Sequence, residues 1–554
     1  MRPIRPSSVV PSAVRPGRRR GPLPGVRLVV TGAVLLAGVA GMLVGTNAQA
    51  DGGAEPVNPY GVLGAQRPRW QVCEWYRAAE PNDPNPNRPG GPASPAQPVT
   101  YCADLRAPLD WYDRAKGTIT LRVTRVPATG GPARRGVLLV NPGGPGTDGS
   151  ALAGRVAEAQ PELLRTHDII GFAPRGVAPS TSVDCGVDWS RYEPVADTRD
   201  RSPANTARQL ADARLVGLAC AGAAFAPYVT TDQTARDLDL IRAVLGERRI
   251  DYLGFSYGTL LGAWYADRFR SRVDRFVLDS TMDWSADPEE VFVDAWARGL
   301  QRRFDVQFLP WLARHDDRYG FGGDVEAARA AYDELRAAVA GHERGTAFDT
   351  MQANVLYDAA GWPQWAERLR ELRDDPTRAP ALLAAPRVPV GVPESGAHWA
   401  IRCGDARWAG DPAHWVDKGD RLAARYPLVG SLATEQPCAA YPFTTAHPAV
   451  PDPAKLPRML LVQNQLDPAT PAEGALAVAA TAHQPMVFVR DAGDHIAFDD
   501  GNACVDARIA DYLVRGLRPT TTICAGLPLP LDDAVHPVGP AGPPPPPRDE
   551  RPTR

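Results

Sequence analysis

The feature that most constrains the fold of this chain is the pentapeptide Gly254-Phe255-Ser256-Tyr257-Gly258. It follows the largely apolar run at residues 250–253 and precedes a helix-like stretch at residues 259–269. A G-x-S-x-G sequence between strand and helix allows a turn sharp enough to expose the serine hydroxyl above a sheet, because the flanking residues are small. We therefore predict that Ser256 is a nucleophile. Similar pentapeptides occur as ordinary turns, so this prediction requires a base, an acid and oxyanion donors elsewhere.

The base and the acid are predicted from chain order, since this catalytic arrangement runs serine, acid, histidine along the sequence. The apolar run at residues 458–463 leads into a loop that contains Asp467, and the run at residues 485–489 leads to His495. Both side chains would lie at the carboxyl edge of a parallel sheet, where such sheets keep their sites. We expect His495 to take the proton of Ser256, and Asp467 to orient the imidazole and stabilise its charge.

Two other acids compete with Asp467. Asp279 ends the apolar run Phe276-Val277-Leu278, and some hydrolases take the acid from that earlier strand, whereas Asp494 is interpreted as a solvated loop charge beside the histidine. We favour Asp467 and expect Thr470, three residues later, to hydrogen-bond its carboxylate. The remaining histidines lack a position in a loop that follows a strand after the acid and are interpreted as structural: His167, His315, His342, His398, His414, His447, His483 and His536.

The oxyanion donors are expected in the loop after an earlier strand, at residues 136–140. That strand leads into Asn141-Pro142-Gly143-Gly144-Pro145-Gly146, where missing side chains let backbone amides approach a substrate. An oxyanion hole combines such an amide with the amide of the residue after the nucleophile. We therefore predict that Gly144 and Tyr257 supply the two donors.

The same loop raises an alternative, because residues 144–149 satisfy the G-x-G-x-x-G pattern of dinucleotide-binding proteins. That fingerprint needs an acid at the end of the next strand. Here the next strand, at residues 168–172, begins with Asp168 and is followed by Ala173. Pro145 also removes an amide that would face the pyrophosphate. We therefore predict no dinucleotide and no other cofactor.

Together these motifs resemble those of secreted bacterial tripeptidyl aminopeptidases and proline-iminopeptidase-like serine peptidases. The resemblance extends from about Cys73 to Cys524 and implies an α/β-hydrolase fold, cleavage near a free peptide N-terminus, and a triad of Ser256, Asp467 and His495. The chain departs from the family at Ala173, where an aspartate is usual, and beside the base, where Asp494 precedes His495. The motifs are residues 141–146, 230–231, 237–239, 254–259, 277–279, 400–405 and 467–471.

The N-terminus has the pattern of an export signal. Arg15, Arg18, Arg19 and Arg20 precede an uncharged apolar stretch at residues 28–44, and Ala48-Gln49-Ala50 follows. A basic flank, an apolar centre and a small-x-small site predict a signal peptide at residues 1–50 and a secreted protein. The apolar stretch could also form an uncleaved membrane anchor, which is the alternative.

Eight cysteines agree with export into an oxidising compartment. Eight cysteines allow 105 pairings, and the sequence does not fix the connectivity. Their order suggests neighbouring pairs, namely Cys73 with Cys102, Cys185 with Cys220, Cys403 with Cys438, and Cys504 with Cys524. The absence of C-x-x-C and of H-E-x-x-H from the sequence leaves a metal site unsupported.

Alternation of strands and helices predicts a mostly parallel α/β sheet, with strands near residues 119–126, 137–140, 168–172, 250–255, 275–278, 459–463 and 486–489. The alternation stops before the strand that carries the acid, where helical spacing predicts a cap. We expect a core at residues 51–283 and 451–527, a helical cap at 284–450, and a Pro-rich disordered tail at 528–554. A net charge of −3 argues against a nucleic-acid partner.

The expected partner is a peptide with a free N-terminus, bound by a monomeric enzyme with no stable membrane partner after signal cleavage. An exopeptidase must recognise a protonated amine, and a carboxylate at a fixed distance from Ser256 would do so. Glu367, Glu394 and Asp405 are the candidates, although we favour an exposed charge or a structural partner for each of them. A secreted carboxylesterase on the same machinery is the second hypothesis, and a non-catalytic binding protein is the third.

Overall fold

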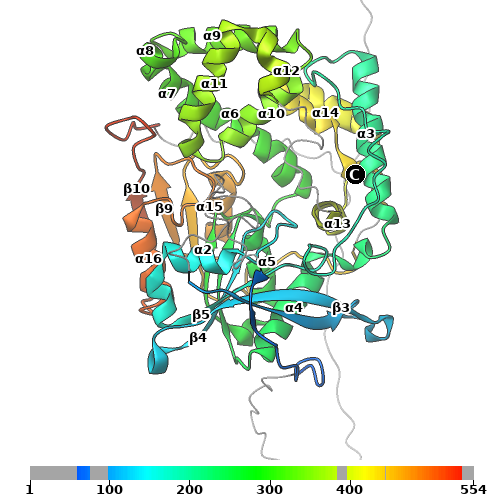
Figure 1. Cartoon of the computed structure of the whole chain (residues 1–554), viewed down its shortest axis with the longest axis vertical. Helices are drawn as coiled ribbons and strands as arrows, with labels where there is room; N and C mark the ends of the chain where they lie inside the picture. The colour runs from blue at the N-terminus through cyan, green and yellow to red at the C-terminus, as the bar shows by residue number, and fades with distance from the viewer. Residues whose placement is uncertain (1–58, 75–97, 384–395, 443–444, 540–554) are drawn as a thin grey trace, which may run out of the picture. The chain divides into compact units, whose positions relative to one another are not determined.

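The computed structural model describes residues 59–74, 98–383, 396–442 and 445–539, and in them the backbone forms one sheet of ten strands (Figure 1). The strands are β1 (Gln71–Val72), β2 (Tyr101–Pro108), β3 (Thr118–Val126), β4 (Gly136–Asn141), β5 (His167–Phe172), β6 (Ile250–Phe255), β7 (Val273–Asp279), β8 (Leu460–Asn464), β9 (Met486–Arg490) and β10 (Thr522–Ala525). Their order across the sheet is β1-β2-β3-β5-β4-β6-β7-β8-β9-β10.

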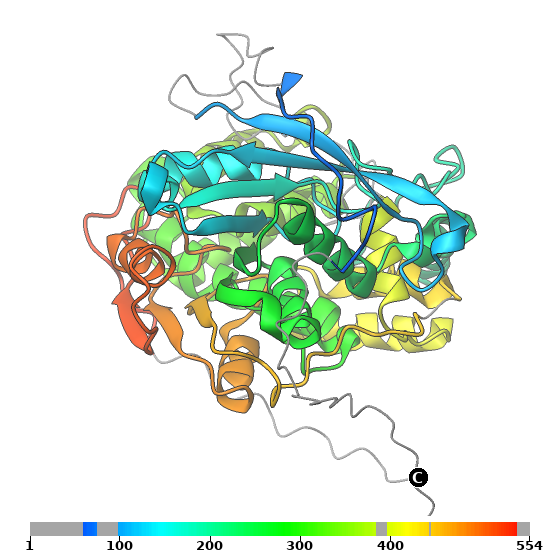
Figure 2. The same ribbon diagram turned by 90° about the horizontal axis from the view of Figure 1, so that it is seen from below.

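The sheet is antiparallel from β1 to β5 and parallel from β5 to β10, which confirms the predicted mostly parallel α/β class. Strands β4, β5, β6 and β8 are buried along their whole length, and this burial explains their apolar sequences. The sequence prediction omitted β1, β2 and β10. β1 and β10 have only two and four residues, too few for a periodic pattern. Figure 2 shows the N-terminal strands side by side from below.

Helices cover both faces of the sheet. α2 (Leu152–Ala159) and α16 (Ala503–Leu513) pack on one face, whereas α4 (Thr231–Val244), α5 (Tyr257–Arg268) and α15 (Ala472–Thr481) pack on the other. α4 begins where the Thr230 side chain accepts a hydrogen bond from the Gln233 amide, and it buries Leu238 and Ile241 as its apolar spacing predicts.

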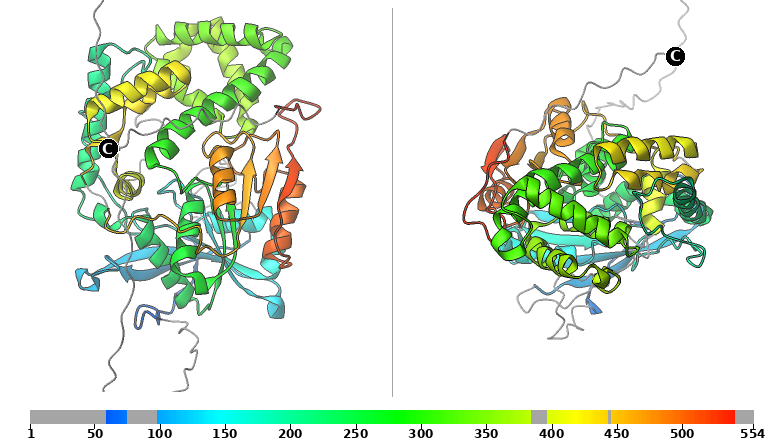
Figure 3. Two further views of the ribbon diagram at one scale, coloured as in Figure 1. Left: turned by 180° about the vertical axis from the view of Figure 1, so that it is seen from behind. Right: turned by 90° about the horizontal axis from the view of Figure 1, so that it is seen from above.

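A helical region with its own apolar core lies over one edge of the sheet (Figures 1 and 3). Three fully buried tryptophans, Trp311, Trp362 and Trp415, belong to that core. Two π-helical segments, η6 (Glu290–Ala295) and η7 (Phe304–Phe308), flank its first α-helix. The α-helices are α6 (Trp296–Arg303), α7 (Leu309–Arg314), α8 (Asp316–Tyr319), α9 (Val325–Ala340), α10 (Gly345–Val355), α11 (Trp362–Asp374), α12 (Ala379–Leu382), α13 (Gly396–Gly404) and α14 (Pro412–Arg425).

One further helix, α3 (Pro203–Gly222), joins this region although it precedes Ser256 in the chain. It packs against α13 and the short helices η10 (Gly430–Thr434) and η11 (Pro437–Ala440). Its Cys220 lies in the same apolar cluster as Cys403. We therefore propose a cap built from residues 284–450 together with α3.

All four neighbouring cysteine pairs form disulfides: Cys73–Cys102, Cys185–Cys220, Cys403–Cys438 and Cys504–Cys524. Cys403–Cys438 lies within the cap and Cys185–Cys220 ties α3 of the cap to the segment after β5; each closes a loop of 35 residues. Such disulfides restrict the unfolded chain and stabilise the native one by about 4 kcal/mol each in the chain-entropy model.

The predicted disorder of residues 528–554 is wrong for residues 528–539, which pack on the folded body. The Trp311 indole donates to the carbonyl of Pro530 at 2.7 Å, Arg314 pairs with Asp532 at 2.6 Å, and the Val538 amide donates to Asp491 at 2.9 Å. The Pro-rich composition did not indicate this packing, because the contacts are made by single polar groups and backbone carbonyls. Residues 540–554 and the predicted signal peptide at 1–50 lie outside the described residues. In the described ranges, no helix has both the length and the apolar character needed to cross a bilayer.

Candidate active site

Ser256 occupies the turn between β6 and α5, as predicted. Its backbone has φ +56° and ψ −125°, a conformation that residues with a side chain rarely adopt and that the surrounding structure must impose. The neighbouring loop approaches this turn closely. A Cβ on Gly258 would lie 2.9 Å from the Asn141 carbonyl oxygen, and a Cβ on Gly143 would lie 2.4 Å from the Phe255 carbonyl oxygen. Only glycine therefore permits this packing of loop on turn.

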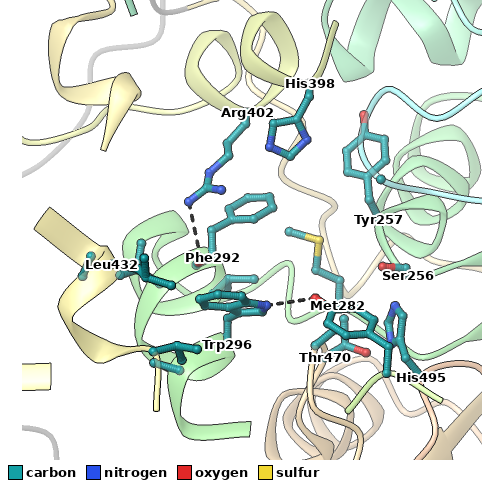
Figure 4. A pocket seen from close by; sticks show the side chains of 18 of the residues that line it. Ser256, Tyr257, Met282, Phe292, Trp296, His398, Arg402, Leu432, Thr470 and His495 are labelled. Carbon is teal, nitrogen blue, oxygen red and sulfur yellow. Dashed lines mark hydrogen bonds between the residues drawn. The ribbon is translucent and has the colours of Figure 1, made fainter. Parts of the chain in front are cut away.

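The structure brings Asp467 and His495 together from the loops after β8 and β9. Nδ1 of His495 lies 3.0 and 3.1 Å from the two carboxylate oxygens of Asp467. Asp467 is fully buried, while 10% of the His495 side chain is exposed. Figure 4 shows the imidazole of His495 directed toward the side chain of Ser256 at one wall of a cavity.

The carboxylate of Asp467 is fixed by more than the histidine. The Thr470 hydroxyl donates to it at 3.0 Å, and the amides of Ala469 and Thr470 each donate at 2.9 Å. Burial would raise the pKa of Asp467, but the His495 ring, the Thr470 amide and the Ser280 hydroxyl lower that pKa below its usual value. The expected hydrogen bond from Thr470 is confirmed, and the group beside the histidine is a carboxylate that stays charged.

The two competing acids have other partners. Asp279 is fully buried and accepts hydrogen bonds from the Phe498 amide at 2.8 Å and from the Ala497 amide at 3.1 Å. Burial raises the pKa of Asp279 to about 7. Its carboxylate therefore anchors the segment that follows the histidine.

The interpretation of Asp494 as a solvated charge is wrong. Its carboxylate pairs with the fully buried guanidinium of Arg303 in α6 and accepts the amide of Ala359 at 2.7 Å. The amide of His495 itself donates to the Tyr357 carbonyl at 2.8 Å. The cap therefore holds the histidine loop from above, through long-range contacts that a local sequence pattern does not reveal.

The two predicted oxyanion donors line the same cavity as Ser256 and His495. Gly144 lies in the loop after β4, and Tyr257 is the first residue of α5. Within the described residues, the amides of Gly144 and Tyr257 have no hydrogen-bond acceptor. Because the loop belongs to this cavity, its G-x-G-x-x-G pattern is explained without a dinucleotide.

The cavity has a volume of about 420 Å³ and lies between the sheet edge and the cap (Figure 4). Most of its cap wall is apolar, with side chains from η6, α6, α13 and η10. The lining residues include Met282, Val291, Phe292, Val293, Trp296, Tyr357, Trp399, Val429, Leu432 and Ala433. Two residues of opposite charge also line it, Arg402 and Glu435.

Neither of the two predicted amine-binding acids that the structure describes, Glu367 and Asp405, is found in this lining. Glu367 lies in α11 and pairs with Arg318 and Arg370 at the surface. Asp405 accepts the Thr231 hydroxyl at 2.5 Å and the Thr231 amide at 3.0 Å, and burial raises its pKa to about 7. Glu394 lies outside the described residues. The placement of Glu367 and Asp405 thus corrects the expectation that they face a substrate.

Asp405 nevertheless acts on the site through a chain of hydroxyl groups. Thr231, which donates to Asp405, also shares a short hydrogen bond with the phenol of Tyr257. Tyr257 directly follows the nucleophile. Asp405 and Thr231 therefore hold the side chain of the residue whose amide faces the cavity.

Glu435 is the carboxylate that the sequence reasoning missed. It is half-buried at the end of η10, and the Tyr192 phenol donates to it at 2.9 Å. Burial raises the pKa of Glu435 to about 7 despite that hydrogen bond, and nearby Asp212 raises it further. Within the described residues it has no basic partner within 4.0 Å. Only the disulfide at Cys438, three residues later, marks this segment in the sequence as part of the folded cap.

A family model described as TAP-like protein matches residues 426–526, and one described as alpha/beta hydrolase fold matches residues 136–318. The chain is 32% identical to a tripeptidyl aminopeptidase of Streptomyces lividans, over 75% of this chain and 81% of that protein. It is 31% identical to the serine protease Hip1 and to carboxylesterase B of Mycobacterium tuberculosis, in each case over 76% of this chain and 86% of the relative.

Proposed function

Since the chain belongs to the TAP-like family of α/β-hydrolases and is a serine hydrolase of that family, we propose that it is a secreted exopeptidase. It releases short peptides or single residues from the N-termini of peptides. The name of the Streptomyces relative supports tripeptides as the released unit. The four disulfides support a location outside the cell, where they persist. The enzyme acts as a monomer on peptides with a free N-terminus.

In the proposed mechanism, His495 accepts the proton of Ser256 as the hydroxyl attacks the scissile carbonyl, and an acyl-enzyme forms on Ser256. The proton then passes to the leaving amine. Asp467 accepts a hydrogen bond from Nδ1–H of His495, which leaves Nε2 free to act as the base, and its charge stabilises the imidazolium. Water completes the cycle by the same steps.

The amides of Gly144 and Tyr257 stabilise the oxyanion of the tetrahedral intermediate. Support comes from their shared position on the cavity wall and from their lack of other acceptors within the described residues. Amides that are already fixed in place need no reorganisation when charge develops on the substrate oxygen.

The observation that carries the exopeptidase proposal is the carboxylate of Glu435 in the cavity that contains Ser256. A half-buried carboxylate without a basic partner is suited to a substrate ammonium group, because the pair would satisfy two groups that are costly to leave alone. Binding of the ammonium would also lower the raised pKa of Glu435. An N-terminus held there sets how many residues precede the scissile bond.

A carboxylesterase is the second candidate. It is supported by the largely apolar cap wall of the cavity, which would accept an acyl chain, and by the relative named carboxylesterase B. An ester acyl group needs no carboxylate partner, so the two functions differ in their dependence on Glu435.

The test compares a tripeptide 4-nitroanilide that has a free amine with its N-acetylated form. The wild-type protein should cleave the free-amine substrate at least about 100-fold more efficiently, and Glu435→Gln should reduce that ratio by raising KM about 10- to 100-fold. Glu367→Gln is the matched control, a surface acid of the cap whose loss should change nothing. Equal cleavage of both anilides, or cleavage of 4-nitrophenyl esters alone, would reject the exopeptidase and favour the esterase.

A further inference from the structure

Arg402 is the only Arg or Lys among the described residues that line the cavity. It lies on α13 one turn after His398, which also lines the cavity. Figure 4 shows both side chains on the wall that faces Ser256 and Tyr257. The guanidinium has no role in the catalytic steps described above.

The hydrogen-bonding capacity of this guanidinium is largely unused. One nitrogen donates to the Phe292 carbonyl at 3.5 Å, the outer limit for such a bond, and the buried Nε has no partner in the part of the chain that the structure describes. Within the described residues, no carboxylate lies within 4.0 Å of it. Arginine has five N–H donors, so most of them remain available.

Three fully buried arginines of this protein, in contrast, form ion pairs. The guanidinium of Arg175 binds both oxygens of Asp237 at 2.7 Å, and that of Arg242 binds Asp239 at 2.6 and 3.0 Å. Arg303 pairs with Asp494. Each of these three arginines therefore has an aspartate partner, whereas Arg402 has none within 4.0 Å among the described residues.

Three aromatic rings position the guanidinium instead. It lies 5.0 Å from the ring centre of Phe292, 5.3 Å from that of Trp408 and 5.7 Å from that of Trp399. Such rings stabilise a cation through its faces and leave its N–H edges free. Burial lowers the pKa of Arg402 to about 10, so the group stays charged at neutral pH.

His398 does not share this charge. Its Nδ1 lies 3.1 Å from the Pro145 carbonyl, which can only accept, so the proton is on Nδ1. Burial lowers the pKa of His398 to about 3, with Arg402 lowering it further. The positive charge of this wall is therefore that of Arg402 alone.

We infer that Arg402 is a carboxylate-binding subsite of the substrate pocket. The inference rests on the proposed hydrolase function. A carboxylate can accept two parallel hydrogen bonds from a guanidinium. Its negative charge would also neutralise the positive charge of Arg402, which the aromatic rings do not. Glu435 does not fill this position, because the two groups lie more than 4.0 Å apart. The carboxylate comes either from an acidic side chain or from the C-terminus of a short peptide.

The test places Glu or Gln in turn at each position of a free-amine alanine tripeptide 4-nitroanilide. A second arm compares tetraalanine with its C-terminal amide. In one arm, the wild-type protein should prefer the charged form in kcat/KM by about 10- to 100-fold. The arm that shows this preference identifies the source of the carboxylate.

Three variants link the preference to the guanidinium. Arg402→Met should bring the ratio of charged to neutral substrate close to one, Arg402→Lys should retain part of it, and Arg407→Met, an exposed neighbour, should leave it unchanged. Folding of each variant is checked by thermal melting and by labelling of Ser256 with a fluorophosphonate. If Arg402→Met does not fold, the Lys variant provides the measurement.

A wild-type protein without preference in either arm, or an unchanged ratio in the Arg402 variants, would overturn the subsite. Failure of the proposed exopeptidase is distinguishable, since folded protein would then cleave none of these peptides. The subsite is tested in that event with the 4-nitrophenyl monoester of succinate against the corresponding succinamate ester. The same ratios and the same variants decide the outcome.

Discussion

The sheet edge and the cap contribute to one cavity in different ways. The catalytic acid and base from the sheet edge are already hydrogen-bonded before any substrate arrives, since Asp467 accepts from Thr470, Ala469 and His495. Among the described residues, the charged groups from the cap, Glu435 and Arg402, each have one side-chain hydrogen bond, which joins them to a neutral group. The contrast indicates that the chemical machinery is preorganised, whereas recognition is left for the substrate to complete.

The largest effect is expected at the nucleophile. Ser256→Ala should lower kcat by about 10⁶-fold, because the acyl-enzyme can no longer form, and should abolish labelling by a fluorophosphonate. Ser285→Ala, an exposed serine, is the control and should label normally. Retained labelling of Ser256→Ala would place the nucleophile elsewhere. The sheet edge would then not hold the preorganised catalytic groups.

The next largest effect separates the two buried aspartates. Asp467→Asn should lower kcat about 10⁴-fold, because an amide favours the wrong tautomer of His495. Asp279→Asn should lower kcat by about tenfold or less, since an amide oxygen can still accept from Ala497 or Phe498. Single-turnover rates for both variants provide the measurement. The reverse order would make Asp279 the catalytic acid.

The sequence predicted the sheet edge better than the cap, for a physical reason. Ser256, Asp467 and His495 each follow an apolar strand, and parallel strands bring their carboxyl ends to one edge without further information. Disulfides between neighbouring cysteines were likewise suggested by chain order. These predictions needed only local pattern and a topology.

The cap could not be predicted in the same way. Glu367 and Glu435 are both acids in helical surroundings, yet one pairs with Arg318 at the surface and the other lines the cavity. Which of them faces Ser256 depends on how η10 packs against α14 and α3, and helical periodicity does not encode that packing. Asp494 was misread for the same reason, since its partner Arg303 lies 191 residues away.

The pH dependence of KM tests whether Glu435 of the cap binds the substrate amine. Burial raises the pKa of Glu435 to about 7, so its carboxylate becomes protonated as the pH falls through 7. KM for a free-amine substrate should therefore rise by up to about tenfold per pH unit below 7. It should also rise above about pH 8, where the substrate amine loses its proton. In Glu435→Gln the acidic arm should be absent, and an identical acidic arm in the variant would assign it to another group.

The smallest effect tests whether the sheet edge is as complete as its contacts suggest. Thr470→Val removes one of the donors to Asp467 but leaves the amides of Ala469 and Thr470 in place. One hydrogen bond of about 1 kcal/mol then predicts a loss in kcat of roughly fivefold with KM unchanged. Thr481→Val, at the exposed end of α15, controls for the substitution itself. A loss as large as that of Asp467→Asn would mean that the hydroxyl of Thr470 alone keeps the carboxylate oriented, and the preorganisation attributed to the sheet edge would then depend on a single donor.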